Sequence, residues 1–530
     1  MKNPRTLALW KTAITTTAFA LLSACTWAQD GAPGLAPHSE DASLRELDSQ
    51  VRELRAVIEQ MRAESAQSRA EMQELRQELQ DTRKLLAPLA ASANAGPASS
   101  TPAESTASFS PGASGTTANA DLGSRVQKLE ESTQLLGSKI DEQYQTKVET
   151  AGKYRARLSG IVLMNAFRNV GASDNLDLPD YAQPPAAGTS QSSFGATLRQ
   201  TEIGLEIFGP TLAGAKSSAN MQFDFAGGFP AANNGVNFGL VRMQTASVRL
   251  DWQHTSVIAG QDSLFISPLA PTSFASLAIP AFAYAGNLWG WTPQLRVEHR
   301  FDLSDQQTVT MQGGILDNLD WETPSNSYFR TATAGESSGQ PAYAMRTAWS
   351  RPVFDHPLSF AVAGYYGRQD WPWGHDVDAW AGMTDWQIPI LRRLTLSGEF
   401  YRGRAVGGLG GAIGQTILYG GNPADATSSI RGLDSAGGWS QVKFQLTPKL
   451  ELNGVFAEDN AFAADVRGFA TDANNFGPIL GRNRGALGNL VYRPRSDLLL
   501  SAEFRRLHTF PVYDSASVTN QVNLAMGILF

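Results

Sequence analysis

The sequence of 530 residues lacks the features that mark several common classes of protein. Its one cysteine, Cys25, lies in the N-terminal segment, which excludes disulfides and thiolate metal sites from the rest of the chain. Beyond that segment no run of about 18 residues is consistently apolar, so no transmembrane helix is expected there. The formal net charge is only −7 and the basic residues are scattered, which gives no sign of a nucleic-acid partner. The mature chain is therefore either soluble or crosses a membrane as strands.

The N-terminal segment has the form of an export signal. Basic residues precede an apolar stretch, 12–24, that is too short to serve as a permanent membrane anchor. Two ends of the signal fit the residues: cleavage after Ala28, or acylation of Cys25 within a lipobox-like sequence. We take residues 1–28 as a signal peptide, because a mature chain that crosses the membrane as strands would need no lipid anchor.

Two heptad repeats and a linker follow the signal. Within residues 40–88 the positions spaced alternately three and four apart are mostly Leu, Val, Ile and Met, with Arg, Glu and Gln between them. A seam that repeats every 3.5 residues keeps facing a partner helix, so this range predicts an α-helical coiled coil. Residues 89–120, rich in Ala, Ser, Thr, Gly and Pro, predict a flexible linker. Residues 121–150 predict a second, short coiled coil.

From residue 151 onward the apolar residues recur at every second position, which predicts strands. The range 151–530 divides into about sixteen strand-like segments, joined alternately by short turns and long loops, and outer-membrane barrels have this asymmetry. The expected fold is an all-β transmembrane barrel of about sixteen antiparallel strands. The segments begin near Tyr154, Phe194, Ser217, Phe238, Thr255, Thr292, Gln306, Ala342, Leu358, Asp376, Arg393, Gly438, Lys449, Ala486, Asp497 and Val518.

The alternation within strands predicts which face meets lipid. In the last segment the even-numbered residues from Val522 to Ile528 are large and apolar, whereas the residues between them are polar or small. We expect the apolar face to contact lipid and the polar face to line a wet lumen. The segment near Phe238 fits poorly, because Arg242 is in phase with the apolar Val248. A subunit interface or a β-bulge would each explain this misfit.

The C-terminal residues, Leu524 to Phe530, resemble the signal by which bacterial outer-membrane barrels are recognised for assembly. Four other segments are distinctive: the heptad leading into Arg157-Leu158-Ser159-Gly160-Ile161-Val162, the strand from Phe194 to Phe208 closed by Gly209-Pro210, Asp224-Phe225, and Ala259-Gly260-Gln261. They are similar to segments of the DcaP-like trimeric outer-membrane porins, and this resemblance covers most of residues 120–530. The resemblance implies a sixteen-stranded homotrimer, held through the barrel and the coiled coil, for passive uptake of small and often anionic solutes.

Strand phase points charged residues of both signs toward the expected lumen. Rings of Arg favour anions, and Arg296, Arg300 and Arg505 offer a permanent charge with a bidentate face for a carboxylate. Glu298 and Glu503 share those faces and would oppose the effect, and paired wall residues without selectivity fit the same pattern. The pore-lining candidates are Arg157, Asp262, Arg296, Glu298, Arg300, Arg346, Glu399, Lys443, Glu503 and Arg505.

The third long loop is uncharged from Ser263 to Gln294 and rich in aromatic residues. Such a loop would be costly to expose to water. It therefore either folds into the lumen and narrows the channel, or packs across a subunit interface. Its candidate constriction residues are Phe265, Phe274, Phe282, Tyr284 and Trp289.

Motifs for catalysis are missing from the sequence. The histidines have no metal-ligand spacing, and the run Gly407-Gly408-Leu409-Gly410-Gly411 lacks the Lys-Ser/Thr of a phosphate-binding loop, so it is expected at a loop tip. Neither a nucleophile elbow nor a nucleotide motif is present. We therefore expect no cofactor, no metal and no enzymatic activity.

The functional hypothesis is a passive diffusion channel for small hydrophilic solutes, in the bacterial outer membrane with its coiled coil in the periplasm. A preference for small anions such as carboxylates is a further part of it. A structural tether between envelope layers is the alternative, and a barrel enzyme is a third hypothesis. The expected partners are the lipid bilayer, two further copies of the chain, the barrel assembly machinery through Phe530, and small solutes, but no nucleic acid.

Overall fold

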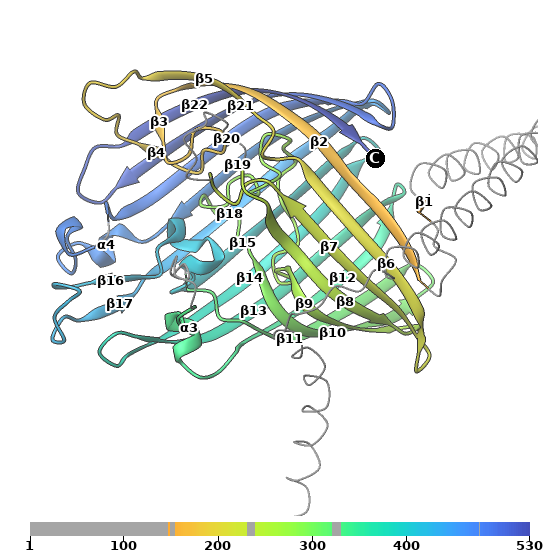
Figure 1. Cartoon of the computed structure of the whole chain (residues 1–530), viewed down its shortest axis with the longest axis horizontal. Coiled ribbons are helices and arrows are strands. Elements are labelled where there is room, and N and C mark those ends of the chain that lie inside the picture. Colours follow the sequence, from red (N-terminus) through yellow and green to blue (C-terminus); the bar gives the residue numbers. More distant parts are fainter. Residues whose placement is uncertain (1–146, 149–153, 230–238, 321–329, 476) are drawn as a thin grey trace, which may run out of the picture. The chain divides into compact units, whose positions relative to one another are not determined.

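The computed structural model describes residues 147–148, 154–229, 239–320, 330–475 and 477–530. The predicted signal peptide, first coiled coil and linker, and most of the second coiled coil, lie outside these residues. In the described part of the chain, sixteen antiparallel strands form a barrel, and Figure 1 shows how the sheet closes on itself. The barrel closes where β2 (Arg155–Val170) pairs with β22 (Ser517–Leu529). Among the described residues, no helix is long and apolar enough to cross a membrane.

Each barrel strand pairs with its neighbours in the chain, which an antiparallel sheet permits because a short turn can join adjacent strands. β5 and β6 together form the second barrel strand, since both pair with β2. The strands after β2 are β5 (Ser192–Thr197), β6 (Glu202–Leu212), β7 (Ala215–Asp224), β8 (Arg242–Asp251), β9 (Thr255–Ser263), β10 (Trp291–Ser304), β11 (Gln307–Leu316), β12 (Ala342–Val353), β13 (His356–Trp371), β14 (His375–Leu391), β15 (Leu394–Arg404), β18 (Asp434–Thr447), β19 (Leu450–Asn460), β20 (Leu480–Tyr492), β21 (Leu498–Pro511) and β22.

The two ends of the barrel differ, as the sequence predicts. One end, which we call the short-turn end, carries tight connections and the C-terminus (Figure 1). The other, the long-loop end, carries the longer connections and the small elements within them. Those elements are β3 (Ala172–Ser173), β4 (Ala182–Gln183), α3 (Ala334–Ser337), η1 (Gly407–Leu409), η2 (Gly411–Gly414), β16 (Ile417–Tyr419), β17 (Ile430–Gly432), α4 (Ala463–Val466) and η3 (Asp472–Asn474).

Side-chain exposure alternates along the strands in the predicted phase. On β22, Leu524 is 58% exposed whereas Asn523, the residue before it, is 2% exposed. The exposed positions of the barrel are mostly apolar and the enclosed positions are often polar, which is the reverse of a soluble protein. Toward the long-loop end the outward residues become charged, for example where Phe504 is followed two residues later by Arg506. This change from apolar to charged residues marks the edge, on the side of the long-loop end, of an apolar band around the barrel.

The misfit in β8 is explained by a β-bulge. The pairing register between β7 and β8 shifts between Gln222 and Phe223, and both Gln244 and Thr245 on β8 are buried in succession. One extra residue reverses the phase of everything that follows it. Arg249 therefore faces the lumen and Val248 faces outward, so the bulge, rather than a subunit interface, accounts for the sequence pattern.

Several strands begin a few residues from the predicted position; β20, for example, begins at Leu480 rather than near Ala486. Three further differences concern a turn, an interruption and a pairing. Pro210 lies within β6, where the register with β7 shifts between Phe208 and Thr211, and the turn follows at Ala213 and Gly214. A proline is tolerated in an irregular, terminal part of a strand, so Gly209-Pro210 is not the turn itself. The second strand is also interrupted between Thr197 and Glu202.

The third difference concerns the end of the predicted second coiled coil. Lys147 and Val148 form strand β1, which pairs with Arg157 and Ala156 of β2. β22 pairs with β2 only from Ile161 onward and so leaves this part of the β2 edge free. The free edge presents unpaired backbone groups that favour an added strand.

The apolar band predicts the effect of an outward-facing charge. Val362 on β13 is 60% exposed among apolar outward residues. We expect Val362→Arg to lower the free energy of unfolding by about 2–4 kcal/mol in lipid vesicles, because an arginine near the middle of the bilayer is poorly solvated. Denaturant titration followed by tryptophan fluorescence measures this change. Ala516→Arg, in an exposed loop, serves as the control, and an equal loss in both variants would contradict the assignment of the lipid-facing surface.

Candidate functional site: the barrel lumen

The loop between β9 and β10, residues Leu264–Gly290, turns into the barrel and is called the inner loop here. Its backbone is bonded to inward side chains of the opposite wall. Glu399 on β15 accepts hydrogen bonds from the Ser267 hydroxyl at 2.6 Å and the Leu269 amide at 2.9 Å. The Gln441 side-chain oxygen on β18 accepts from the Thr272 amide at 2.7 Å. Of the two places that the sequence allows for this loop, the structure shows the lumen.

A buried ion pair on β21 holds the next part of the inner loop. Glu503 and Arg505 lie 2.8 Å apart, and each side chain is 2% exposed. Glu503 accepts a hydrogen bond from the Ser273 hydroxyl at 2.6 Å, and Arg505 donates to the Ser276 hydroxyl at 2.7 Å. Glu503 and Arg505 were predicted to line the pore; together with Glu399 they face inward but lie beneath the inner loop. All three therefore position the loop.

Apolar side chains of the inner loop pack against three sides of the barrel. Phe282 contacts Gly485 so closely that a Cβ atom there would lie 2.1 Å from the phenyl ring. Phe265 belongs to a buried cluster with wall residues of β13 to β15, and Phe274 packs against a small buried cluster that includes Ile161 of β2. Tyr284 and Trp289 meet edge to face with ring centroids 6.2 Å apart. The five aromatic candidates thus lie within the barrel.

The break in the second strand also serves the inner loop. Gln200, fully enclosed, lies in the interruption between β5 and β6. Its side-chain nitrogen donates to the Ala275 carbonyl at 3.0 Å, and its oxygen accepts from the Leu277 amide at 2.8 Å. A regular strand would place consecutive side chains on alternate faces, so the interruption lets this glutamine reach the loop.

Opposite the inner loop, charged side chains of β8 to β14 form a connected set that we call the wall network. Arg249 pairs with Glu298 at 3.1 Å, and Arg296 pairs with Asp262 at 2.9 Å and with Glu298 at 3.0 Å. Arg346 and Asp385 form a bidentate pair, with distances of 2.8 and 2.9 Å. The amide of Gln312 donates to Glu298 at 2.8 Å and accepts from Arg346 at 3.3 Å, which joins the two halves. Asp251, bonded to Arg249 at 2.7 Å, completes the network.

The remaining candidates lie toward the short-turn end. Arg300 pairs with Asp302 at 3.1 Å, and its side chain is 50% exposed. Lys443 lies 3.6 Å from Glu451, and Arg157 is paired with Glu206. Every predicted basic residue thus has an acidic partner. The structure does not bring Arg300 together with Arg296 and Arg505 at the inner loop.

Strand phase alone missed several residues of the wall network. Arg249 and Asp251 follow the β8 bulge, which inverts their phase, so a regular alternation assigns them to the lipid face. Asp385 and Gln312 lie on strands whose alternation is correct, and each is a polar residue on the inward phase. That pattern was the signal available for these two residues.

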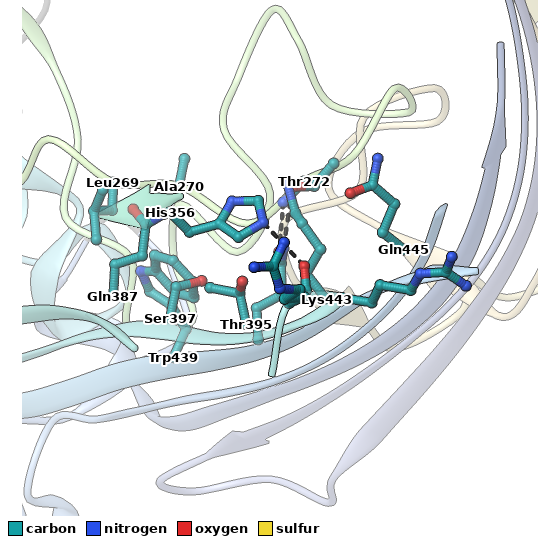
Figure 2. A pocket seen from close by; sticks show the side chains of 13 residues that line it. Leu269, Ala270, Thr272, His356, Gln387, Thr395, Ser397, Trp439, Lys443 and Gln445 are labelled. Carbon is teal, nitrogen blue, oxygen red and sulfur yellow. Dashed lines mark hydrogen bonds between the residues drawn. The ribbon is translucent and has the colours of Figure 1, made fainter. Parts of the chain in front are cut away.

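A cavity of about 340 Å³ lies below the inner loop at the short-turn end (Figure 2). Leu269, Ala270 and Thr272 of the inner loop form one side. Residues of β13 to β18 and the turn before β15 form the other side, which is basic. The wall residues are His356, Gln387, Arg392, Arg393, Thr395, Ser397, Trp439, Gln441, Lys443 and Gln445. The cavity thus offers cationic and amide groups to an anionic or polar solute. Nowhere in the described part of the chain do three or more metal-ligating side chains come together.

A second loop, residues 171–191 between β2 and β5, folds over the long-loop end. Asp177 forms a bidentate pair with Arg199, one contact being 2.9 Å. The Ala182 amide donates to the Thr509 hydroxyl at 2.8 Å, and Asn483 donates to the Asp180 carbonyl at 2.9 Å. Burial raises the pKa of the Asp180 carboxyl well above its usual value, and the nearby Asp174 raises it further, while Arg505 acts in the opposite direction.

Comparison with known proteins gives a match in structure alone. No family model matches the chain, and no curated protein is significantly similar to it. The outer membrane channel DcaP of Acinetobacter baumannii aligns with a TM-score of 0.53 and 14% identity, over 73% of this chain and 100% of that chain. The chain therefore has the fold of that channel, which confirms, at the level of the fold, the resemblance to DcaP-like porins.

Two further porins align with lower scores. The anion-selective porin from Comamonas acidovorans gives a TM-score of 0.43 and 12% identity, over 71% of this chain and 100% of that chain. OprB of Pseudomonas putida gives 0.43 and 13% identity, over 71% and 94% of the two chains.

The bonds of Glu399 predict how firmly the inner loop is held. Glu399→Ala leaves the Ser267 hydroxyl and the Leu269 amide without their partner, and an unsatisfied buried group costs about 1–3 kcal/mol. We expect the Leu269 amide to lose protection from hydrogen exchange, measured by mass spectrometry. The control is Glu451→Ala, which removes an inward carboxylate that pairs with Lys443 instead of the inner loop. Unchanged exchange in Glu399→Ala would show that this contact does not fasten the loop.

The raised pKa of Asp180 predicts a pH dependence for the loop of residues 171–191. The seated loop favours the protonated carboxyl, so seating is strongest at low pH and weakens as the pH rises from about 4 through the raised pKa. A nitroxide label on Ala187→Cys should become more mobile over that range, as measured by electron paramagnetic resonance. Asp180→Asn should abolish this change, whereas Asp514→Asn, in another loop, should not. A label that responds equally with Asp180→Asn would refute the assignment.

Proposed function

We propose that the chain is an outer-membrane porin, a passive diffusion channel for small hydrophilic solutes. The observation that carries this proposal is an uncharged loop bonded across the polar lumen of a barrel whose outer face is apolar. Lipid is the environment that stabilises such an outer face, because the strands pair their backbone groups with one another around the closed barrel. A loop inside the lumen narrows the passage without blocking it, and such a narrowing suits the selection of solutes by size.

The chain's orientation and assembly belong to the same proposal. Residues 1–28 direct export, and the short-turn end faces the periplasm together with the two coiled coils. Phe530 reaches the barrel assembly machinery from that end; its backbone amide donates to the Gly160 carbonyl at 3.1 Å, which keeps the terminal residue in the sheet. The barrel and the coiled coil hold a homotrimer.

For selectivity we propose a weak preference for small anions such as carboxylates. The wall network does not provide it, because its arginines are neutralised by carboxylates at salt-bridge distances. The cavity at the short-turn end is the better source, because Arg393, which lines it, donates to the Leu446 carbonyl at 3.2 Å and no carboxylate lies at salt-bridge distance from it in the described residues. Lys443 adds a second positive charge, which Glu451 at 3.6 Å offsets only in part. Rings of basic side chains at a channel mouth raise the local concentration of anions.

The other two functions have less support. A tether between envelope layers relies on the predicted coiled coils, and these lie almost wholly outside the described residues. A barrel enzyme would need a catalytic constellation; among the described residues, most charged groups of the lumen are instead paired with one another or bonded to a loop within the barrel. In a channel, the paired charges and the loops within the barrel both have a role, since they shape the passage.

Conductance in planar bilayers tests the channel directly. Purified protein should produce discrete open steps, because solvated charges line the short-turn mouth. A membrane with inserted barrels and no steps would favour the tether.

A salt gradient tests the selectivity. The reversal potential should show a modest anion preference that falls in Arg393→Ala combined with Lys443→Ala, because these changes remove positive charge from the cavity. Arg351→Ala, an exposed arginine on the outward phase of β12, is the control. A cation preference in the unaltered protein, or no shift in the double variant, would leave a general porin without anion selectivity.

A further inference from the structure

The sequence predicted that the glycine-rich segment of the loop between β15 and β18 lies at an exposed loop tip. The structure places it elsewhere. Residues Gly407–Gly414 form η1 and η2, and all except Gly408 are buried. The preceding Val406 and the enclosed Leu409 join the same apolar cluster as Phe265 and Leu288 of the inner loop. The segment therefore folds inward and rests on the inner loop from the long-loop side.

Backbone contacts fix the segment to its neighbours on several sides. The Trp289 amide of the inner loop donates to the Leu409 carbonyl at 2.9 Å. The Thr416 hydroxyl donates to the Asp320 carbonyl, in the loop after β11, at 2.7 Å. Gln415 exchanges two hydrogen bonds with Leu480 of β20, at 2.9 and 3.1 Å. The segment thus connects the β11 side of the long-loop end to the β20 side.

Glycine is required where the segment touches its neighbours. A Cβ atom on Gly410 would lie 2.4 Å from the Ala283 carbonyl oxygen of the inner loop, and the residue has a φ of +85°. A Cβ atom on Gly408 would lie 2.4 Å from the Leu319 carbonyl. At these positions backbone approaches backbone so closely that only glycine fits, which explains the glycine run. An exposed loop tip would not require it.

Asp459 on β19 anchors the segment. Its carboxylate is fully enclosed and accepts hydrogen bonds from the Tyr401 hydroxyl at 2.8 and 2.9 Å. The backbone amides of Ala412 and Ile413 also face it and favour its charged form. Both residues have the left-handed conformation, with φ of +49° and +58°, which turns successive amides toward one acceptor. The Ala412 amide lies 2.9 Å from the Tyr401 oxygen, so the phenol joins the segment to the carboxylate.

Two strained residues at one carboxylate indicate that the conformation is maintained by this anchor. A non-glycine residue in the left-handed region is unfavourable, and it persists only where surrounding contacts enforce it. Without the carboxylate, the Tyr401 hydroxyl that accepts from the Ala412 amide would lose the acceptor that holds it, and the Ile413 amide would lose the negative charge that it faces. The inward position of the segment therefore depends on Asp459.

We propose that the glycine-rich segment, anchored by Asp459, is a second constriction of the channel, stacked on the inner loop. This inference rests on the proposed channel function and adds the element that sets the size limit from the long-loop end. The stretch from Val406 to Ile417 contains no charged residue. It therefore restricts solutes by size, whereas charge acts at the opposite mouth.

The test uses the full chain in planar bilayers and in liposomes that swell with sugars of increasing size. Asp459→Ala should release the segment, raise single-channel conductance about twofold or more, and admit larger sugars, because the constriction widens. Asp459→Asn retains one acceptor oxygen and should give an intermediate increase. Deletion of residues 408–411 should reproduce the effect of Asp459→Ala. Deletion of residues 424–427, the exposed tip of the same loop, is the matched control and should leave conductance unchanged.

The outcomes distinguish a failure of the channel function from a failure of the second constriction. An unaltered protein that inserts but never conducts would refute the channel, whereas a conducting protein with unchanged Asp459→Ala and 408–411 deletion variants would overturn only the second constriction. Tyr401→Phe removes a single hydroxyl and decides the matter if the larger changes prevent assembly. A conductance above that of the unaltered protein supports the anchor, and an equal conductance overturns it.

Discussion

The inner loop can lie inside the barrel only because its backbone groups find partners on the wall. A buried amide or carbonyl without a partner costs as much as a lost hydrogen bond, and an uncharged loop brings few partners of its own. Glu399, Gln441 and the Glu503–Arg505 pair supply these bonds from β15, β18 and β21. Their charges therefore serve to hold the loop, and charges that could attract solutes remain at the short-turn end.

On the other side of the lumen, charged side chains are likewise engaged in contacts within the protein. Arg249 and Arg296 each lie between two carboxylates, and Arg346 forms a bidentate pair with Asp385, so the wall opposite the inner loop is rigid and nearly neutral. A paired set of this kind keeps water in the passage and adds little to ion selectivity. With the glycine-rich segment above and the inner loop in the middle, size selection and charge selection are separated along the barrel.

Much of the barrel could be predicted from the sequence, because the period of two and the alternation of short and long connections are local signals. β10, β21 and β22 have the predicted phase throughout. The β8 bulge could not be located, since one added residue leaves no mark in composition and yet moves Arg249 into the lumen. The sequence also showed that Glu399, Glu503 and Arg505 face inward, but whether they line the passage or bond the inner loop depends on contacts more than 100 residues apart in the chain. The buried glycine run was misassigned for the same reason.

Modification of a single introduced cysteine tests most directly whether the inner loop lies in the conducting path. The chain's one cysteine, Cys25, lies in the predicted signal segment, so Ala270→Cys on the exposed side of the inner loop can be labelled selectively with a charged thiol reagent. The account predicts that labelling reduces single-channel current, and that labelling Ala516→Cys in an external loop does not. Current that is unchanged after complete labelling of Ala270→Cys would contradict a lumen occupied by this loop.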